Sequence, residues 1–193
     1  MTSIRSLAVF CGSRVGINPV YAAAGRTLGQ GMGRAGIRLV YGGGRIGIMG
    51  VVANAVLEAG GQVLGVIPEF LTKMEVAHEM ATEMVVTDTM HTRKLRLYEE
   101  SDAFLIMPGG LGTFDEAFEI ITWRQLRLHD KPILLCNVAG WAEPLVAMID
   151  HAIRQGFADP SCRGLFEVID SVEAALERLK TLEPGGRGKP ERL

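Results

Sequence analysis

The chain has few cysteines, no long apolar run and no block of basic residues, and each scarcity excludes a class of protein. Its three cysteines are widely spaced and never form C-x-x-C, so they predict buried thiols in a reducing compartment rather than disulfides. No apolar stretch approaches the roughly 18–20 residues that a membrane-spanning helix needs. The net charge of −2, without a basic patch, argues against nucleic acid as the main partner.

The histidines and serines likewise lack the spacing of familiar reactive sites. The four histidines show no H-x-x-x-H or other ligand pattern, so no metal is expected. Nothing in the sequence requires a Schiff-base lysine, so no cofactor is expected either. Ser13 follows Gly12 but does not stand in a G-x-S-x-G elbow, which favours a loop hydroxyl that binds substrate over a nucleophile. The first residues resemble a strand rather than a cleavable signal segment, so we expect a cytoplasmic protein.

Short apolar runs closed by glycine or proline are frequent in this chain of 193 residues and 24 glycines. Such runs are typical of buried strands. They predict strands over residues 7–11, 37–41, 62–67, 84–87, 103–107, 132–136 and 166–169. Between most of them lie amphipathic stretches bounded by helix signals. Asn18 and Pro19 are expected to open the first helix, Gly36 to end it, and Asp170 to cap the last one.

Strands that alternate with helices of roughly 10–16 residues predict an α/β fold. We expect a single doubly wound, Rossmann-like domain over residues 1–183, with a parallel sheet of about seven strands and helices on both faces. Residues 69–83 show no clear period and predict a loop with one helical turn. Residues 184–193 are rich in glycine and proline and predict a disordered tail.

The stretch Met107-Pro-Gly-Gly-Leu-Gly-Thr-Phe-Asp-Glu116 lies where a predicted strand turns into a predicted helix. Gly109, Gly110 and Gly112 allow the backbone to approach a ligand closely, and the helix start offers unpaired N–H groups to a phosphate. Thr113 is expected at the N-cap, and Glu116 in the first turn beside the bound group. The alternative is a capping box, in which Glu116 binds only the N-cap amide.

Other candidate segments follow the first two predicted strands, or begin the predicted helix that precedes the strand over residues 103–107. Gly42-x-Gly44-x-x-Gly47 formally matches the dinucleotide fingerprint, with Glu69 about 20 residues further on. The match lies on the second strand–helix turn instead of the first, and the glycines equally suit tight turning. Arg93 and Lys94 either face a phosphate or carboxylate, or form an exposed basic pair.

Three motifs occur in order at predicted strand ends or just before a strand. They are Tyr41-Gly-Gly-Gly-x-x-Gly-x-Met-Gly50, Met90-His-x-Arg-Lys94 and Pro108-Gly-Gly-x-Gly-Thr-x-x-Glu116. Together they resemble the Lonely Guy (LOG) family, the cytokinin riboside 5′-monophosphate phosphoribohydrolases, which were long labelled possible lysine decarboxylases. The resemblance covers nearly the whole chain. It implies hydrolysis of the N-glycosidic bond of AMP or an N6-substituted AMP to free base and ribose 5-phosphate. It also implies a homodimer with sites near the subunit interface, and no metal.

The resemblance assigns Arg93 and Glu116 to the catalytic pair. The residues expected to bind substrate or phosphate are Ser13, Gly43, Gly44, Met90, Lys94, Gly109, Gly110, Gly112 and Thr113. The chemistry agrees, because glycosidic cleavage passes through an oxocarbenium-like ribose that a carboxylate stabilises while it orients a water. Arg93 would hold Glu116 ionised, or would contact ribose or phosphate.

Two other functions remain open at the level of the sequence. One is a nucleotide-binding carrier or sensor without turnover, which would use the same phosphate turn. The other is a nicotinamide-dependent oxidoreductase that uses Gly42–Gly47. The sequence does not decide whether the base carries an N6 group, whose pocket is expected within residues 69–83 or from the partner subunit.

Overall fold

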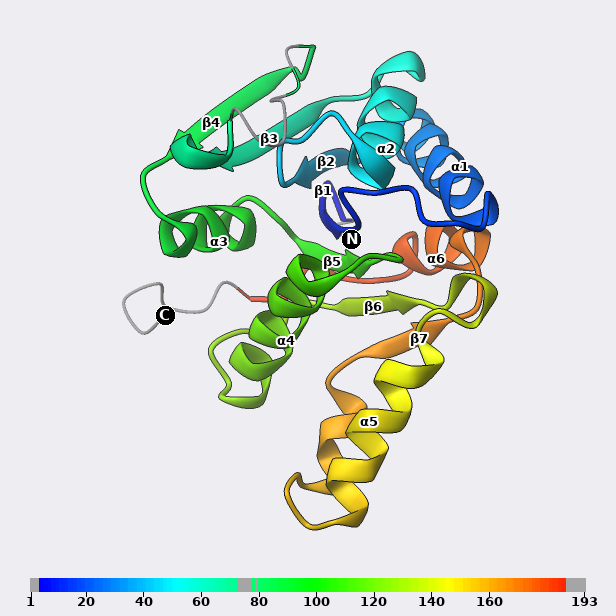
Figure 1. Ribbon diagram of the computed structural model, residues 1–193, viewed down its shortest axis with the longest axis vertical. Helices are drawn as coiled ribbons and strands as arrows, with labels where there is room; N and C mark the ends of the chain where they lie inside the picture. Colours follow the sequence, from blue (N-terminus) through cyan, green and yellow to red (C-terminus); the bar gives the residue numbers. More distant parts are fainter. Residues whose placement is uncertain (1–3, 73–77, 79, 187–193) are drawn as a thin grey trace.

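The computed structural model describes residues 4–72, 78 and 80–186, and their centre is a parallel sheet of seven strands (Figure 1). The strands are β1 Ser6–Phe10, β2 Arg38–Tyr41, β3 Val63–Pro68, β4 Glu83–Thr87, β5 Ala103–Ile106, β6 Ile133–Cys136 and β7 Glu167–Ile169. Each coincides with a predicted strand to within one residue at either end. The predicted fold class, a doubly wound Rossmann-like sheet, is therefore confirmed.

The strand order is β4-β3-β2-β1-β5-β6-β7, and all neighbours run parallel. Figure 1 shows this order from top to bottom. The chain winds outward from β1 in one direction and from β5 in the other, so β1 and β5 form the topological switch point. Their register pairs Leu7 with Ala103 and Phe10 with Ile106. In such sheets, ligands bind at the carboxyl ends of the strands beside the switch point.

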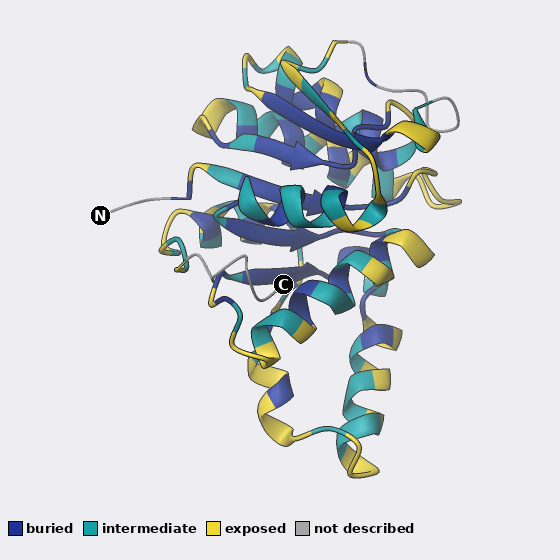
Figure 2. Ribbon diagram, turned by 90° about the vertical axis from the view of Figure 1, so that its left-hand side faces the viewer, coloured by how far each residue is buried: buried dark blue, intermediate teal, exposed yellow. Residues whose placement is uncertain are grey.

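Helices cover both faces of the sheet. The helices α1 Val20–Ala35, α2 Gly47–Glu58 and α6 Val172–Leu179 pack on one face. The helices α3 Met90–Glu99, α4 Leu111–Gln125 and α5 Glu143–Arg154 pack on the other. Figure 2 shows the strands buried between them, with exposed residues on the outer helical surfaces. None of the described helices is long and apolar enough to cross a membrane.

The helices α1 and α2 approach closely because glycines face the second helix. A Cβ on Gly29 would stand 2.5 Å from the carbonyl oxygen of Val52, and one on Gly33 would stand 2.9 Å from that of Val56. Gly36 ends α1 in the left-handed conformation, with φ 68°, as predicted. These positions fix the layer that supports the loops after β1 and β2.

Buried cysteines and a buried lysine complete the core. Cys11, Cys136 and Cys162 are free and buried, which confirms the prediction of buried thiols. Lys131 is only 1% exposed. Its ammonium donates to the Tyr98 carbonyl oxygen at 2.6 Å and lies 3.9 Å from the centre of the Tyr98 ring. The lysine therefore links β6 to the end of α3.

Several predicted helix boundaries differ from the structure. Pro19 precedes α1 instead of occupying its first position, although the Asn18 side chain still accepts from the N–H of Val20 at 3.1 Å. Ser171, not Asp170, caps α6 by accepting from the N–H of Ala174 at 3.1 Å. Both boundaries are shifted by one residue, and at α6 two adjacent polar residues compete for the same cap.

Single helical turns lie between the main elements. The single turn predicted within residues 69–83 is the 3₁₀ turn Glu69–Leu71, while residues 73–77 and 79 lie outside the described part. Further 3₁₀ turns cover Val138–Gly140 and Pro160–Gly164. Gly185 lies against the backbone of Lys131, and residues 187–193 are outside the description, so the disordered tail stays a prediction.

Candidate active site

The loops after β1 and β5 touch at the switch point. The N–H of Gly12 donates to the Pro108 carbonyl oxygen at 3.0 Å, and the N–H of Met107 donates to that of Phe10 at 2.9 Å. A Cβ on Gly12 would stand 3.2 Å from Cα of Gly109. Glycine at position 12 therefore lets two backbone segments meet where a ligand is expected.

The turn between β5 and α4 presents unpaired backbone donors. The helix α4 begins at Leu111 with Gly110 at its N-cap, so Thr113 is not the N-cap that the sequence predicted. Within the described chain, the N–H groups of Gly110, Leu111, Gly112 and Thr113 have no hydrogen-bond acceptor. A Cβ on Gly110 or Gly112 would meet nothing within 4 Å. Free donors, open space and the positive end of the helix dipole together suit an anion.

Thr113 and Gly109 close the inner side of this turn. Thr113 is buried, and a Cβ on Gly109 would overlap its hydroxyl group. The close fit explains why a glycine precedes the threonine by four residues. Thr113 thus lies in the first turn of α4, where its own N–H is one of the unpaired donors.

The N-terminus of α2, by contrast, is already occupied by the chain itself. The N–H groups of Ile48 and Met49 donate to the Gly12 carbonyl oxygen at 3.0 and 3.3 Å. A Cβ on Gly47 would overlap the backbone of Ser13. The glycines of the second turn therefore serve close packing under the first loop. The amides that a dinucleotide pyrophosphate would need are in use, which argues against the dinucleotide alternative.

A buried ion pair lies beside the α4 turn. Nη1 of Arg93 is 2.9 Å from Oε1 of Glu116, and the two side chains are only 8% and 11% exposed. The Nε of Arg93 also donates to the Val66 carbonyl oxygen at 3.2 Å, which fixes the guanidinium against β3. A Cβ on Gly42 would overlap the guanidinium. The structure thus brings together the two residues assigned to catalysis, from α3 and α4.

This geometry also rules out the capping-box alternative for Glu116. A capping box needs the acid at the third position of the helix. Glu116 is the sixth residue of α4, one turn further along than expected, and its carboxylate faces Arg93. The one capping box of this kind among the described helices is at α3, where Thr89 and Thr92 exchange hydrogen bonds.

Lys94, expected to bind substrate, has two acidic neighbours on α4. Its Nζ lies 2.8 Å from Oδ2 of Asp115 and 3.4 Å from Oε1 of Glu119. Burial lowers the pKa of Lys94, but the two carboxylates raise it more, so the pKa is above its ordinary value. Burial raises the pKa of Glu119, and Lys94 opposes this only in part. The lysine is 15% exposed and charged.

The loop after β2 and the start of α3 form a second wall of the candidate site. Gly43 has φ 82°, a conformation that favours glycine, and its carbonyl oxygen accepts from the N–H of His78 at 3.0 Å. His78 is buried, its Nε2 lies 3.0 Å from Oδ1 of Asn54, and burial lowers its pKa. Gly44 is buried and Met90 is half-buried. No sequence pattern singled out His78.

A cavity of about 830 Å³ adjoins the α4 turn at the switch point. Its lining includes the loop Gly12–Asn18, Tyr21, Ile48, the segment Pro108–Leu111 and Trp141. The Trp141 ring stacks on Phe114 with 5.7 Å between ring centres. Sequence reasoning found Ser13 and the glycines of this cavity but missed Tyr21 and Trp141, which are distant in the chain and belong to no motif.

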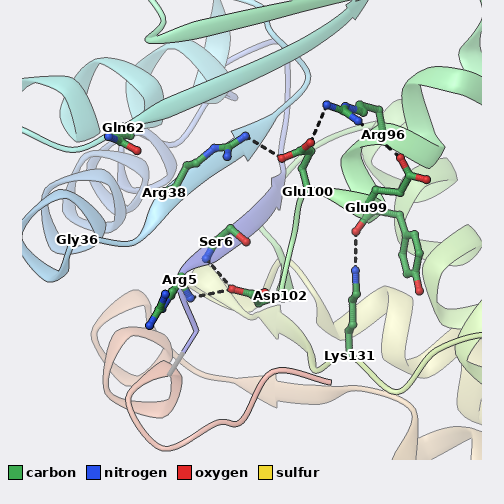
Figure 3. A pocket seen from close by; sticks show the side chains of 11 residues that line it. Arg5, Ser6, Gly36, Arg38, Gln62, Arg96, Glu99, Glu100, Asp102 and Lys131 are labelled. Atoms are coloured by element: carbon green, nitrogen blue, oxygen red, sulfur yellow. Dashed lines mark hydrogen bonds and ion pairs between the residues drawn. The ribbon is translucent and has the colours of Figure 1, made fainter. Parts of the chain in front are cut away.

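A second cavity, of about 730 Å³, lies at the opposite edge of the sheet (Figure 3). Figure 3 shows the side chains of Arg38, Arg96 and Lys131 bonded to partners within the chain. Arg38 and Arg96 lie 2.9 and 2.8 Å from the carboxylate of Glu100. Asp102 accepts from the N–H groups of Arg5 and Ser6 at 2.8 and 3.0 Å. These bonds and the negative helix ends nearby make this edge a poor site for a phosphate.

The fold and the site define a class: a Rossmann-like α/β protein with a turn of unpaired amides at the switch point and a buried Arg–Glu pair beside it. The family model described as possible lysine decarboxylase matches residues 49–179. A cytokinin riboside 5′-monophosphate phosphoribohydrolase of Rhodococcoides fascians is 42% identical over 92% of this chain and 90% of its own. A probable one of Oryza sativa subsp. japonica is 43% identical, over 96% and 82%. The chain belongs to this family, the LOG family.

Solved structures agree with the fold at lower identity. A molybdenum cofactor binding protein of Rippkaea orientalis has a TM-score of 0.68 and 20% identity, over 91% of this chain and 95% of its own. The molybdenum cofactor carrier protein of Chlamydomonas reinhardtii has a TM-score of 0.66 and 21% identity, over 91% and 95%. At these identities the likeness shows the fold alone.

The description of the family model suggests pyridoxal phosphate chemistry, which the described residues do not fit. A Schiff base needs a lysine whose amine is readily deprotonated. The raised pKa of Lys94 keeps its amine charged between two carboxylates. Lys131 is buried and lines the cavity at the opposite edge of the sheet, and Lys180 forms an ion pair with Glu177 at the end of α6. None of the lysines in the described part of the chain is therefore suited to a Schiff base at this site.

Proposed function

We propose that this protein hydrolyses the N-glycosidic bond of a purine nucleoside 5′-monophosphate, AMP or an N6-substituted AMP, and releases the free base and ribose 5-phosphate. The observation that carries the proposal is the Arg93–Glu116 pair, 2.9 Å apart and buried, beside a turn of unpaired amides. Relatives at about 42% identity bear the name of this activity.

The 5′-phosphate binds at the start of α4 in this proposal. The N–H groups of Gly110, Gly112 and Thr113 donate to its oxygens, Gly109 supports the turn by packing against Thr113, and Ser13 lines the same cavity. Charge-assisted hydrogen bonds are roughly twice as strong as neutral ones, so the unphosphorylated nucleoside is a much poorer substrate. Gly43, Gly44 and Met90 line the other side of the site.

Glu116 acts on the ribose and on water. The water oxygen forms the new bond to C1′ while the C1′–N9 bond breaks. The electron pair of the C1′–N9 bond leaves with the base. The base takes up a proton and the water loses one. As positive charge develops on the ribose ring, the Glu116 carboxylate stabilises it and orients the water.

Arg93 keeps the acid in place and ionised. Its bond to the Val66 carbonyl oxygen anchors the guanidinium, and a cation at 2.9 Å favours the carboxylate form of Glu116 over the acid. The carboxylate form is the one that stabilises a cationic transition state. Loss of Glu116 leaves the buried guanidinium of Arg93 without the carboxylate that balances its charge.

We also propose a cytoplasmic homodimer with the site near the subunit interface. Large apolar side chains at the mouth of the cavity support the dimer, since Ile17 is fully exposed and Leu111 is 86% exposed. Three buried free cysteines suit a reducing compartment. Light scattering on the purified protein measures the mass and decides between monomer and dimer.

Base release from AMP and from N6-isopentenyl-AMP, followed by chromatography, tests the proposed reaction. Glu116→Gln keeps the shape of the side chain but removes its charge, so we expect turnover to fall by at least about a hundredfold, the scale of an electrostatic contribution. Nucleotide affinity, measured by calorimetry, is expected to change little. Near-normal rates in this variant would remove Glu116 from catalysis.

The same experiment separates the enzyme from a non-catalytic carrier or sensor. Binding of AMP by the folded wild-type protein without release of any base supports the carrier. Release that disappears in Glu116→Gln supports the hydrolase. The ratio of the two wild-type rates then shows whether the N6 group is part of the preferred substrate.

A further inference from the structure

The cavity beside the α4 turn has one charged residue among the described residues that line it. This residue is Arg14, on the loop between β1 and α1. The rest of the lining consists of glycines, apolar and aromatic side chains and a few neutral polar groups. Pockets for small molecules commonly combine apolar walls with a few placed polar groups. The position of this cation indicates where a negative group of a ligand would lie.

The side chain of Arg14 is available to a ligand. The residue is exposed, and within the described part of the chain it makes neither an ion pair nor a side-chain hydrogen bond. Arg93, by contrast, is buried and already pairs with Glu116. Because no described carboxylate pairs with Arg14, its full charge acts on the cavity.

The backbone around Arg14 is held against the α4 turn. The Gly12 carbonyl oxygen accepts from the N–H of Ile48 at 3.0 Å, and a Cβ on Gly47 would overlap the backbone of Arg14. A Cβ on Gly12 would stand 3.2 Å from Cα of Gly109, so this loop lies directly beside the turn of unpaired amides. The base of the arginine side chain is therefore fixed next to the expected phosphate, while its guanidinium is exposed at the cavity.

The charges already present on α3 and α4 do not balance a phosphate. Arg93 and Lys94 face three carboxylates, those of Asp115, Glu116 and Glu119. With all five groups ionised, two positive and three negative charges leave a net charge of −1. A phosphate monoester adds about −1.5 to −2 at pH 7. The start of α4 offsets only part of this, because a helix N-terminus is equivalent to about half a positive charge.

We propose that Arg14 is a phosphate-binding residue, whose guanidinium contacts the 5′-phosphate at the α4 turn from the side of the β1 loop. The inference rests on the proposed function, because it completes the phosphate site for that substrate. A guanidinium presents its donors in a planar fork that fits two oxygens of one phosphate. Arg14 thus adds to the amide donors of the turn the positive charge that the neighbouring helices lack.

Calorimetry with AMP and with adenosine tests this role without depending on turnover. Arg14→Gln removes the charge, so we expect the Kd for AMP to rise about tenfold, which corresponds to about 1.4 kcal/mol. The Kd for adenosine, which lacks the phosphate, is expected to stay within about twofold. Arg14→Lys keeps the charge but not the fork, so its Kd for AMP is expected to lie between those of the wild type and Arg14→Gln.

Arg34→Gln is the matched control. Arg34 is also exposed and has no ion pair within the described chain, but it lies in the last turn of α1, at the end away from the cavity. This variant is expected to bind both ligands as the wild type does. An unchanged Kd for AMP in Arg14→Gln overturns the proposal. An equal loss of affinity for AMP and adenosine also overturns it, because the phosphate would then not be the group that Arg14 recognises.

Base release measured on the same proteins separates this inference from the proposed function. We expect kcat/KM for AMP to fall about tenfold in Arg14→Gln, in line with the loss of affinity. AMP affinity that depends on Arg14 in a protein that releases no base supports the phosphate contact and defeats the hydrolase. Base release by the wild type, with an AMP affinity that is the same in Arg14→Gln, defeats the phosphate contact alone.

Discussion

Gly112 has open space where a side chain would stand, although it lies in the first turn of α4. Alanine is the better helix former by about 1 kcal/mol, so Gly112→Ala is expected to leave the melting temperature unchanged or raise it. The added methyl group occupies the approach of a phosphate to the unpaired amides. We therefore expect KM for AMP to rise about tenfold, which corresponds to about 1.4 kcal/mol.

Enzyme assays combined with thermal unfolding check this expectation. Gly164→Ala is the control, because its Cβ would also meet nothing within 4 Å and it lies outside the α4 turn. That variant is expected to keep the KM of the wild type. An unchanged KM in Gly112→Ala would place the phosphate elsewhere.

Single residues also show which features of the site can be predicted from the sequence and which cannot. The glycine motif located the turn, because a run of three nearby glycines between a strand and a helix has few other uses. The motif did not show that α4 begins at Leu111, two residues before Thr113. Nor does a local pattern show that Arg93, 23 positions before Glu116, meets it at 2.9 Å. The family resemblance supplied that pair, and the packing of α3 against α4 explains it.

At the scale of elements, the close contact between α1 and α2 limits the size of the side chains that α1 can carry on that face. A Cβ on Gly29 would stand 2.5 Å from the Val52 carbonyl oxygen and 2.6 Å from Cβ of Ala55. Overpacking of this kind costs about 1–3 kcal/mol and outweighs the gain in helix propensity. Gly29→Ala is expected to lower the melting temperature by several degrees.

Gly25, one turn earlier, provides the comparison in the same helix. A Cβ there would lie 3.2 Å from a methyl group of Ile48, which is an atom of a side chain and yields more readily than backbone. The melting temperature of Gly29→Ala should therefore be lower than that of Gly25→Ala. Equal melting temperatures would mean that α1 and α2 separate without cost.

Elements differ in how well the sequence specifies them. Parallel strands are buried on both faces, so each is a continuous apolar run, and all seven were predicted. Helix ends depend on which of two adjacent polar side chains reaches the free amides. At α6 this choice falls to Ser171 over Asp170, and only three-dimensional geometry decides it.

At the scale of the whole molecule, stability depends on keeping a buried histidine neutral. His129 is 6% exposed, its Nε2 lies 2.9 Å from the Ile120 carbonyl oxygen, and its Nδ1 accepts from the N–H of Lys131 at 3.1 Å. These bonds require a neutral ring that donates from Nε2. Burial, opposed by the hydrogen bond to Ile120 and by Asp130 but assisted by Lys131 and Arg124, lowers the pKa of His129 below 6.5.

The sign of the pH dependence follows from this shift. Below about pH 6.5 the unfolded chain binds a proton at His129 that the folded chain excludes, so stability falls as the pH decreases toward the lower folded pKa. Melting temperatures are expected to be lower at pH 5 than at pH 7.5. His129→Gln should reduce that difference, and the exposed His151→Gln should not. Identical pH profiles in the wild type and both variants would show that His129 does not control the pH dependence of the melting temperature.

Chemical modification of the three buried thiols reports local opening of the fold. Burial raises the pKa of the Cys11 thiol, and it raises that of Cys136 to about 12. The thiolate is the form that attacks an alkylating reagent, so the folded molecule resists modification, and a modified cysteine marks a segment that has opened. Cys11 follows β1, Cys136 ends β6, and Cys162 lies in the turn before β7. The order in which the three are modified therefore reveals which side of the switch point separates first.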